Sequence, residues 1–204
     1  MTVPSAHLGP WELLFRFDLS GPVVPYSAPM PTSPIEGVEL IEDFTPESSR
    51  LLEHFQRNIA WDTRMRARLT ASFGAPYDYS GITYPPVPMP PDLRAMAQAV
   101  EGVARHRITN CLINFYPEGA SSMGFHSDSY EHLEPGTTVS IISLGGPRTL
   151  RFRRKDAREH LVDLRLGSGS LLVMQQHIQD AWQHALPPEP TAPPRMSLTF
   201  RCII

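Results

Sequence analysis

The sequence predicts an α+β fold in which helices occupy the first half of the chain and an antiparallel jelly roll occupies the second. Two observations carry this prediction. Apolar residues recur about every 3.6 residues at 46–58 and 92–105, whereas from residue 107 onward their period changes to two. The second half is also divided by glycine and proline, as in Gly145-Gly146-Pro147. Several short strands with such punctuation are typical of an antiparallel barrel or jelly roll.

Length and composition indicate one globular domain with irregular segments attached. The chain has 204 residues, of which 41% are hydrophobic and 19% are charged, a balance that disordered chains do not show. Proline is abundant, with 22 residues, and seven of these lie within the first 36 positions. We therefore expect a proline-rich N-terminal arm at 1–36 and a single domain at 37–204, with the jelly-roll core at 107–204.

Charge, cysteine content and hydropathy favour a reducing, cytoplasmic setting. The net charge of −3 neither indicates nor excludes a nucleic-acid partner. Cys111 and Cys202 lie in strand-like apolar runs without metal-binding spacing, so we expect buried free thiols. No apolar run approaches the length of about 18 residues that a membrane span needs, and no signal-peptide pattern is visible. We expect a cytoplasmic monomer without membrane contact.

The first half of the chain predicts a short strand and two helices. The run Val38-Glu39-Leu40-Ile41 is typical of a strand. Thr45-Pro46-Glu47 supplies an N-cap, a proline at the first helical position and an acid in the first turn, which predicts a helix at 46–58. Apolar stripes mark this helix and the next one, at 92–105: they consist of Leu51, Leu52 and Phe55, and of Leu93, Met96, Val100 and Val103.

Period-two alternation predicts six strands in the second half. They lie at about 108–116, 138–144, 149–154, 161–166, 170–175 and 195–203. Along the last strand, alternation places Met196, Leu198, Phe200 and Cys202 on an apolar face, and Arg195, Ser197, Thr199 and Arg201 on the opposite face. Two arginines that flank two hydroxyl groups suit a recess for a dicarboxylate, because a guanidinium pairs with a carboxylate through two hydrogen bonds. The alternative is an exposed face with scattered cations.

A His-x-Asp motif at His126 and Asp128 indicates a metal site. On a strand, side chains two apart point to the same face, so an imidazole and a carboxylate can bind one ion from a single segment. A third ligand must come from downstream, where His160, His177 and His184 are available. His160 lies in a charged run that is typical of a surface, and we favour His184 over His177 because it directly precedes a proline-rich break.

Together these features predict an oxygenase site. Two histidines and one carboxylate on one face of an octahedron, with open positions opposite, are characteristic of non-haem Fe(II) oxygenases. A 2-oxo acid would fill two of the open positions, dioxygen would fill the third, and the far carboxylate of the 2-oxo acid would pair with an arginine. Asn114 and Tyr116 lie two apart on a predicted strand and could add an amide and a phenol to the recess.

With these motifs in this order, the chain resembles the AlkB family of Fe(II)/2-oxoglutarate-dependent dioxygenases from about residue 64 to the C-terminus. The resemblance rests on Asn-x-Tyr, His-x-Asp, the distal histidine and a closing Arg-x-Asn-x-Thr-Phe-Arg element, in which Ser197 replaces the asparagine. It implies a double-stranded β-helix that holds Fe(II) through His126, Asp128 and His184. It also implies that 2-oxoglutarate is bound by Asn114, Tyr116, Arg195 and Arg201, with O2 as the second co-substrate. From the polar face of the last strand, we expect Ser197 and Thr199 to contribute to the same co-substrate site.

Residues 61–91 look like the nucleotide-recognition lid of that family. A flipped base needs an aromatic face for stacking and cations near its phosphates. We therefore expect substrate contacts from Arg68, Phe73, Tyr77, Tyr79, Tyr130, Arg154 and Trp182. The alternative interpretation of the segment is a proline-rich loop that is pinned by tyrosines.

A cluster of basic residues at 148–165 could follow a phosphate backbone. Its members are Arg148, Arg151, Arg153, Arg154, Lys155, Arg158 and Arg165. Because Asp156, Glu159 and Asp163 interrupt the cluster, the alternative is a solvated sheet edge.

Tyr130 departs from the family pattern, in which Asp or Glu two residues after the ligand aspartate favours a cationic methylated base. A tyrosine keeps a hydrogen-bonding tip but removes the negative charge. The sequence therefore predicts an Fe(II)/2-oxoglutarate-dependent dioxygenase that oxidatively demethylates N-alkylated nucleobases in single-stranded DNA or RNA. The alternative is hydroxylation or demethylation of a small-molecule metabolite or natural product. A non-catalytic binding module is disfavoured, because the predicted ligand and arginine set is complete.

Overall fold

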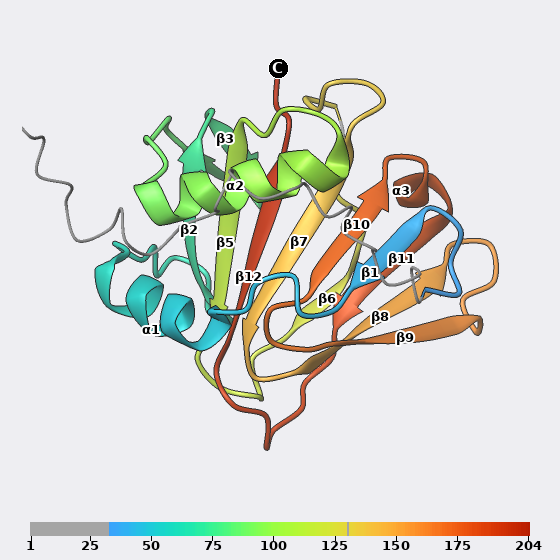
Figure 1. Cartoon of the computed structure of the whole chain (residues 1–204). Coiled ribbons are helices and arrows are strands. Elements are labelled where there is room, and N and C mark those ends of the chain that lie inside the picture. Colours follow the sequence, from blue (N-terminus) through green and yellow to red (C-terminus); the bar gives the residue numbers. More distant parts are fainter. Residues whose placement is uncertain (1–32, 130) are drawn as a thin grey trace, which may run out of the picture.

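Two antiparallel sheets face each other in the computed structural model, and helices cover the outer face of the larger sheet (Figure 1). The structure describes residues 33–129 and 131–204. Residues 1–32 of the predicted arm and Tyr130 of the predicted substrate site therefore lie outside the described residues. The architecture is the predicted α+β jelly roll.

The larger sheet has six strands in the order β1-β10-β7-β12-β5-β2, and every neighbouring pair is antiparallel. Their bounds are Val38–Ile41 (β1), Leu69–Gly74 (β2), Asn110–Tyr116 (β5), Thr138–Gly145 (β7), Leu171–Gln175 (β10) and Arg195–Arg201 (β12). Strand β12 pairs with both β5 and β7, so that Ser197 lies opposite Asn114 on one side and Ser143 on the other. Polar residues from three strands are thereby brought into one row.

The smaller sheet has four strands in the order β6-β11-β8-β9. Their bounds are Met123–His126 (β6), Arg148–Arg154 (β8), Leu161–Leu166 (β9) and Trp182–Leu186 (β11). The register places His184 of β11 directly opposite His126 of β6. A short helix, α3 (Ile178–Ala181), leads into β11, and β3 (Tyr77–Tyr79) pairs with β4 (Ile82–Tyr84) in a separate hairpin.

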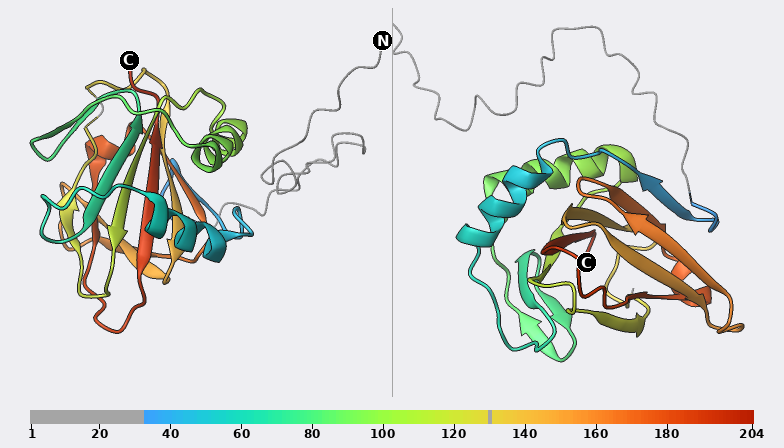
Figure 2. Two further views of the ribbon diagram at one scale, coloured as in Figure 1. Left: turned by 90° about the vertical axis from the view of Figure 1, so that its left-hand side faces the viewer. Right: turned by 90° about the horizontal axis from the view of Figure 1, so that it is seen from below.

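Helices α1 (Ser48–Asn58) and α2 (Pro91–Ala104) lie on the outer face of the larger sheet, as Figure 2 shows. Their apolar stripes pack against the outward-facing side chains of β5, β7 and β12, because alternation leaves one face of each strand apolar. The members of this first core include Leu51, Phe55, Leu93, Met96, Val100, Ile113, Phe115, Ile142, Met196, Leu198 and Phe200. In the described part of the chain, no helix combines the length and the apolar character that crossing a bilayer demands.

Helix α1 begins two residues later than predicted. Glu47, rather than Thr45, occupies the N-cap position, and it makes no capping hydrogen bond through its side chain. The backbone N–H of Thr45 instead donates to the carbonyl of Gly169 at 2.9 Å, which ties this segment to the loop before β10. The second predicted helix is found within one residue of its expected range.

The space between the two sheets is divided into an apolar half and a polar half. The apolar half is a second core that includes Val139, Leu150, Phe152, Leu164, Leu172 and Met174. In the polar half, the inward faces of β5 and β12 lie opposite β6 and β11 and line a recess. The same strands therefore build a core with one face and the recess with the other, as strand alternation dictates.

The sequence-based prediction lacks strands β2, β3, β4, β6 and β11. Strand β2 lies within the predicted lid at 61–91 and pairs with β5, so that this segment is part sheet and part hairpin. Because β1 and β2 both belong to the larger sheet, the jelly roll begins before the predicted boundary at 107. Strands β6 (Met-Gly-Phe-His) and β11 (Trp-Gln-His-Ala-Leu) contain no β-branched residues, whereas the equally short β1 does, so their sequences do not favour a strand.

Candidate metal centre

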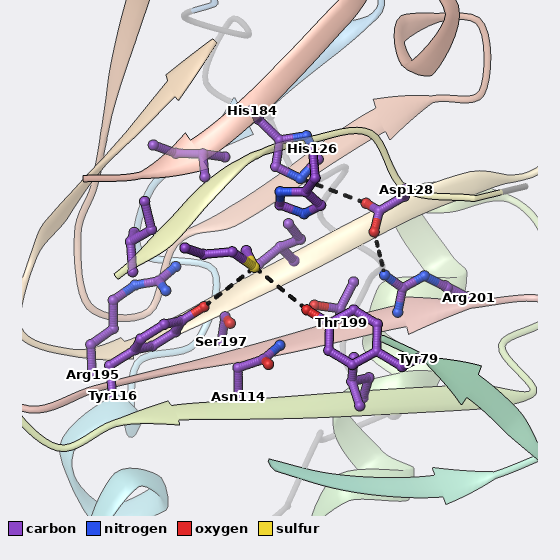
Figure 3. A pocket seen from close by; sticks show the side chains of 15 residues that line it. Tyr79, Asn114, Tyr116, His126, Asp128, His184, Arg195, Ser197, Thr199 and Arg201 are labelled. Carbon is purple, nitrogen blue, oxygen red and sulfur yellow. Dashed lines mark hydrogen bonds and ion pairs between the residues drawn. The ribbon is translucent and has the colours of Figure 1, made fainter. Parts of the chain in front are cut away.

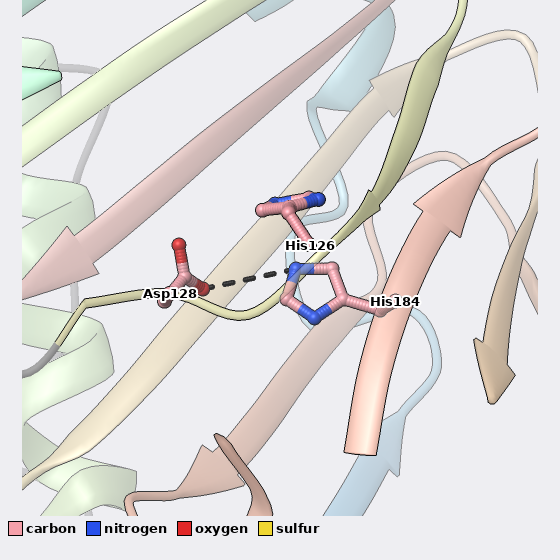
Figure 4. Close-up of side chains that lie close together, drawn as sticks. All are labelled: His126, Asp128 and His184. Atoms are coloured by element: carbon pink, nitrogen blue, oxygen red, sulfur yellow. Dashed lines mark ion pairs between the residues drawn. The ribbon is translucent and has the colours of Figure 1, made fainter. Parts of the chain in front are cut away.

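Three side chains converge at the polar end of the space between the sheets (Figure 4). His126 is the last residue of β6, Asp128 follows it outside the strand, and His184 lies on β11. Their candidate ligand atoms all lie within 4.8 Å of one another. This is the predicted set, although only its two histidines lie on strands. Of the alternative histidines, His177 packs against Gly37, and His160 lies edge-on to Trp182 at 5.5 Å.

The surroundings of the two histidines suit metal binding. His126 Nδ1 lies 3.0 Å from the carbonyl oxygen of Gly124. Because a carbonyl only accepts hydrogen bonds, Nδ1 donates to Gly124, and Nε2 is the ring atom left to bind a metal. Burial lowers the pKa of His184 to about 4, so this imidazole is neutral near pH 7. The contact of 3.8 Å between His184 Nε2 and Asp128 Oδ2 is therefore not an ion pair at that pH.

Asp128 is held as an anion. Burial would raise the pKa of this carboxyl, but the charge and the hydrogen bond of Arg201 outweigh burial and help to lower the pKa to about 2. Arg201 Nη2 donates to Asp128 Oδ1 at 2.8 Å, which leaves Oδ2 on the side of His184. A buried carboxylate and two imidazoles whose candidate ligand atoms lie close together match the donor set of a divalent cation.

A recess next to these residues contains the predicted co-substrate residues (Figure 3). Its polar walls are formed by Asn114 and Tyr116 from β5, and by Arg195, Ser197, Thr199 and Arg201 from β12. Both faces of β12 are buried, so the alternative of an exposed strand with scattered cations is wrong.

Both arginines of the recess have buried nitrogen atoms without hydrogen-bond partners among the described residues. Arg195 donates from Nη2 to Ser143 Oγ at 2.7 Å, and its Nε has no partner among the described residues. In that same part of the chain, Nε and Nη1 of Arg201 also lack partners. Burial lowers the pKa of Arg195 to about 10, so it remains a cation near pH 7. Two buried guanidiniums with free N–H groups fit a ligand that carries two carboxylates.

The predicted lid contributes several residues to the edge of this recess. Arg68 donates from Nε to Asn114 Oδ1 at 2.8 Å and from Nη2 to the hydroxyl of Tyr79 at 2.7 Å. The rings of Tyr77 and Tyr79 stack at 6.1 Å, and the ring of Tyr77 lies 5.0 Å from the guanidinium of Arg201. Arg68 therefore joins the lid to the recess.

Phe73 is not a substrate residue, which corrects the prediction. It lies on β2 opposite Cys111 and packs against the first core, on the helix side of the sheet. The prediction treated this segment as a loop. It therefore did not consider that side chains alternate along a strand, which directs Phe73 away from the recess.

Trp182 and Arg154 form a pair at the side of the metal centre. They lie opposite each other on β11 and β8, and the guanidinium of Arg154 lies 5.7 Å from the centre of the Trp182 ring. Trp182 precedes His184 by two residues on the same strand, so both side chains share one face. Trp182 also packs against the second core, and neither residue of the pair lines the recess.

The basic cluster at 148–165 is mostly neutralised, as its alternative interpretation expected. Arg151 pairs with Asp163, Arg154 with Asp156, and Arg165 with Glu189. Arg148 is fully buried, and its Nη2 donates to the carbonyls of Ser121 and Pro187. A role for Arg148 along a phosphate backbone is therefore wrong.

Sequence reasoning missed two residues that belong to the recess. Ser143 lies opposite Ser197 on β7 and accepts the hydrogen bond of Arg195. The sulfur of Met123 lies 3.4 Å from the Tyr79 hydroxyl and 4.0 Å from the Tyr116 hydroxyl. Alternation along the predicted strand 138–144 could have identified Ser143, whereas no pattern near Met123 indicates its position.

The chain is similar to two groups of relatives. It is 35% identical to the DNA oxidative demethylase ALKBH2 of Homo sapiens over 153 residues, which cover 71% of the chain and 59% of the relative. It is 32% identical to the alpha-ketoglutarate-dependent dioxygenase alkB homolog 3 of Mus musculus over 177 residues, which cover 77% of the chain and 62% of the relative. The matched part is therefore less than two thirds of either relative. This similarity confirms the AlkB-like resemblance.

Two solved structures share the fold. OsALKBH1 matches with a TM-score of 0.63 at 17% identity, over 81% of this chain and 97% of that chain. A Pseudomonas putida prolyl-4-hydroxylase matches with a TM-score of 0.53 at 15% identity, over 81% of this chain and 92% of that chain. At such identities the likeness shows the fold alone, and it confirms the predicted jelly roll.

A family model described as the 2OG-Fe(II) oxygenase superfamily matches residues 41–201. The match includes the three metal-centre residues and both arginines of the recess. It confirms the predicted use of Fe(II), 2-oxoglutarate and O2. By this match, and by the donor set that the fold assembles, the chain belongs to the 2OG-Fe(II) oxygenase superfamily.

Proposed function

We propose that this chain is an Fe(II)/2-oxoglutarate-dependent dioxygenase that oxidatively demethylates N-alkylated nucleobases in DNA or RNA. The observation that carries the proposal is the group of His126 and the buried Asp128 and His184, beside two buried arginines whose N–H groups are not all paired among the described residues. The relatives support the substrate class, since one of them is a DNA oxidative demethylase by name.

The protein residues bind and orient the reactants. His126, Asp128 and His184 would hold the iron, and Arg195 would hold a carboxylate of 2-oxoglutarate with help from Asn114 and Tyr116 in the same recess. When bound, iron and 2-oxoglutarate supply the oxidation, in which O2 is consumed, 2-oxoglutarate becomes succinate and CO2, and an N-methyl group leaves as formaldehyde. Buried apolar neighbours such as Ile141 and Leu186 keep water away from the recess.

Aromatic residues around the metal centre suit a nucleobase. Tyr79 lines the recess and stacks with Tyr77, so the hairpin presents a π-face beside the metal residues. On β11, Trp182 lies two residues before His184 and provides a second ring. A base that has left its stack recovers stacking energy on such rings, about 1–3 kcal/mol for each base.

A small-molecule substrate is the second candidate function. The ion pairs of Arg151, Arg154 and Arg165 reduce the positive charge that the cluster at 148–165 could offer to a phosphate backbone. The net charge of −3 and the tyrosine at position 130 point the same way. Salt dependence separates the two candidates, because binding through phosphates weakens steeply with salt and binding of a neutral metabolite does not.

The deciding experiment measures formaldehyde and succinate together. Methylated single-stranded oligonucleotides are incubated with the chain, Fe(II), 2-oxoglutarate and ascorbate, and unmethylated oligonucleotides and the His126→Ala variant serve as controls. Formaldehyde that requires both the methyl group and His126 is the expected result. Succinate without formaldehyde would move the substrate to a small molecule, and succinate that persists in His126→Ala would refute the dioxygenase assignment itself.

Two further parts of the proposal concern the state of the protein. We propose a monomer in the cytoplasm. Sedimentation or size-exclusion measurements at working concentration test whether the protein is a monomer. Fractionation of cells that express the chain tests whether it is located in the cytoplasm.

A further inference from the structure

We propose that Gln179 is a positioning residue for the metal centre: its carboxamide holds the backbone of Asp128 so that the carboxylate faces the two histidines. The inference rests on the proposed function, because it concerns the same metal centre. It adds a residue that touches neither the metal ligands' donor atoms nor the co-substrate recess.

The contact is a buried hydrogen bond between distant segments. The backbone N–H of Asp128 donates to Gln179 Oε1 at 2.9 Å, and the two residues are 51 positions apart. Gln179 is 2% exposed and Asp128 is 8% exposed. Strand β6 ends at His126, so Asp128 lies beyond the ladder that pairs β6 with β11. The Gln179 side chain supplies the acceptor that a strand neighbour would otherwise provide, and a buried N–H without one is costly.

The orientation of the Gln179 amide follows from its partner. A backbone N–H only donates, so the amide must present its oxygen to Asp128. The amide nitrogen of Gln179 is then buried, and it has no hydrogen-bond partner among the described residues. The buried side chain of Gln179 thus makes a hydrogen bond through its amide oxygen alone, which indicates that its role is to accept the hydrogen bond of Asp128.

Gln179 is itself anchored on two sides. Its N–H donates to the carbonyl of Gln176 at 3.0 Å, and its own carbonyl accepts from Lys155 Nζ at 2.7 Å. It lies in α3, which leads directly into β11 and therefore to His184. One short segment thus sets the positions of two metal ligands: it carries His184 five residues later, and it holds Asp128 through the Gln179 side chain.

Gln179 and Arg201 act on different parts of Asp128. Arg201 holds Oδ1 of the carboxylate, whereas Gln179 holds the backbone from which the side chain projects. Together they leave Oδ2 directed at His184. Groups that orient a metal ligand in this indirect way typically contribute about 10–100-fold to metal affinity.

The test uses Co(II) as the probe, because it binds Fe(II) sites without turnover and its visible absorption reports ligand geometry. Gln179→Met keeps the length of the side chain and removes the acceptor, whereas Gln179→Glu keeps an acceptor at the same distance. Gln176→Met is the matched control, since Gln176 lies three residues away and bonds to Glu134 and Thr137 instead. Co(II) affinity, the Co(II) spectrum and the Tm of the metal-free protein are measured for each full-length variant.

We expect Gln179→Met to weaken Co(II) binding by about 10–100-fold and to change the spectrum. Gln179→Glu should stay within about threefold of wild type, and Gln176→Met should lower Tm without affecting Co(II). If Gln179→Met does not fold, Gln179→Asn replaces it, because its shorter side chain cannot reach Asp128. Wild-type affinity and spectrum in the acceptor-free variant, or an equal loss in Gln179→Met and Gln179→Glu, would overturn the inference. Failure of the wild-type chain to bind Co(II) would instead count against the proposed function.

Discussion

Arg195→Met is expected to weaken 2-oxoglutarate binding strongly while the ligand-free protein keeps its stability or gains some. These opposite effects have one cause: the buried guanidinium of Arg195 donates to Ser143, but its Nε has no hydrogen-bond partner among the described residues. Methionine fills a similar volume without a charge, and replacing a poorly compensated buried charge by an apolar side chain is often neutral or stabilising.

The magnitude follows from the surroundings of the Arg195 guanidinium. Burial lowers the pKa of Arg195 from its ordinary value to about 10, which corresponds to about 3 kcal/mol less favourable energy for the charged form. A carboxylate that accepts two charge-assisted hydrogen bonds gains about 1.5–3 kcal/mol from each. Losing both bonds in Arg195→Met should therefore raise the Kd for 2-oxoglutarate by about 10²–10⁴-fold.

Isothermal titration of 2-oxoglutarate into the Mn(II)-loaded protein measures this Kd, and thermal unfolding without metal measures stability. The matched control is Arg151→Met, which removes an exposed arginine paired with Asp163 and should change neither quantity appreciably. A Kd for Arg195→Met within about threefold of wild type would refute the assignment of Arg195 to the carboxylate. A large decrease in the Tm of ligand-free Arg195→Met would refute the inference that the buried charge of Arg195 is poorly compensated by its neighbours.

Three further outcomes test the rest of the structure. His184→Ala should abolish Co(II) binding measured by absorption and His177→Ala should leave it intact, and the reverse would contradict the choice of ligand. Phe73→Ala should lower the free energy of urea unfolding by about 2 kcal/mol, because it truncates core, while KM for a substrate stays unchanged. Glu189→Gln should lower the free energy of unfolding at neutral pH. Burial raises the pKa of Glu189, but Arg165 and Thr149 outweigh burial and lower it, so the difference in unfolding free energy between wild type and variant should shrink as pH falls below about 4.5. A difference that does not change with pH would show that the charge of Glu189 is not its cause.

The strand that carries the two arginines was predictable because side-chain direction in a strand is a local property. Alternation along 195–201 separates Arg195 and Arg201 from the apolar residues between them, whatever the rest of the fold does. The same reasoning fails for Phe73, because nothing in the sequence marks 69–74 as a strand rather than part of a loop. The outcome there depends on pairing with β5, 38 residues further along the chain at Cys111.

Buried polar contacts were the least predictable part of the site. The sequence is equally compatible with an Arg68 that contacts a phosphate and with an Arg148 that lies on the surface beside the other basic residues, but the structure shows neither. Their partners are an amide 46 residues away for Arg68, and backbone carbonyls of loops for Arg148. Such contacts form because burial leaves polar groups no water to bond with, and burial is a result of the whole fold.

By itself, the sequence determined the class of fold, the His-x-Asp motif and the polar face of the last strand, since each follows from residue type and spacing over a few positions. Only the tertiary structure decided which distant histidine joins that motif: the register between β11 and β6 sets His184 opposite His126. It also decided that Gln179 meets Asp128 and that Ser143 meets Arg195. The physical reason is that hydrogen bonds between strands and buried side chains join segments far apart in the chain, and no local pattern records which segments will meet.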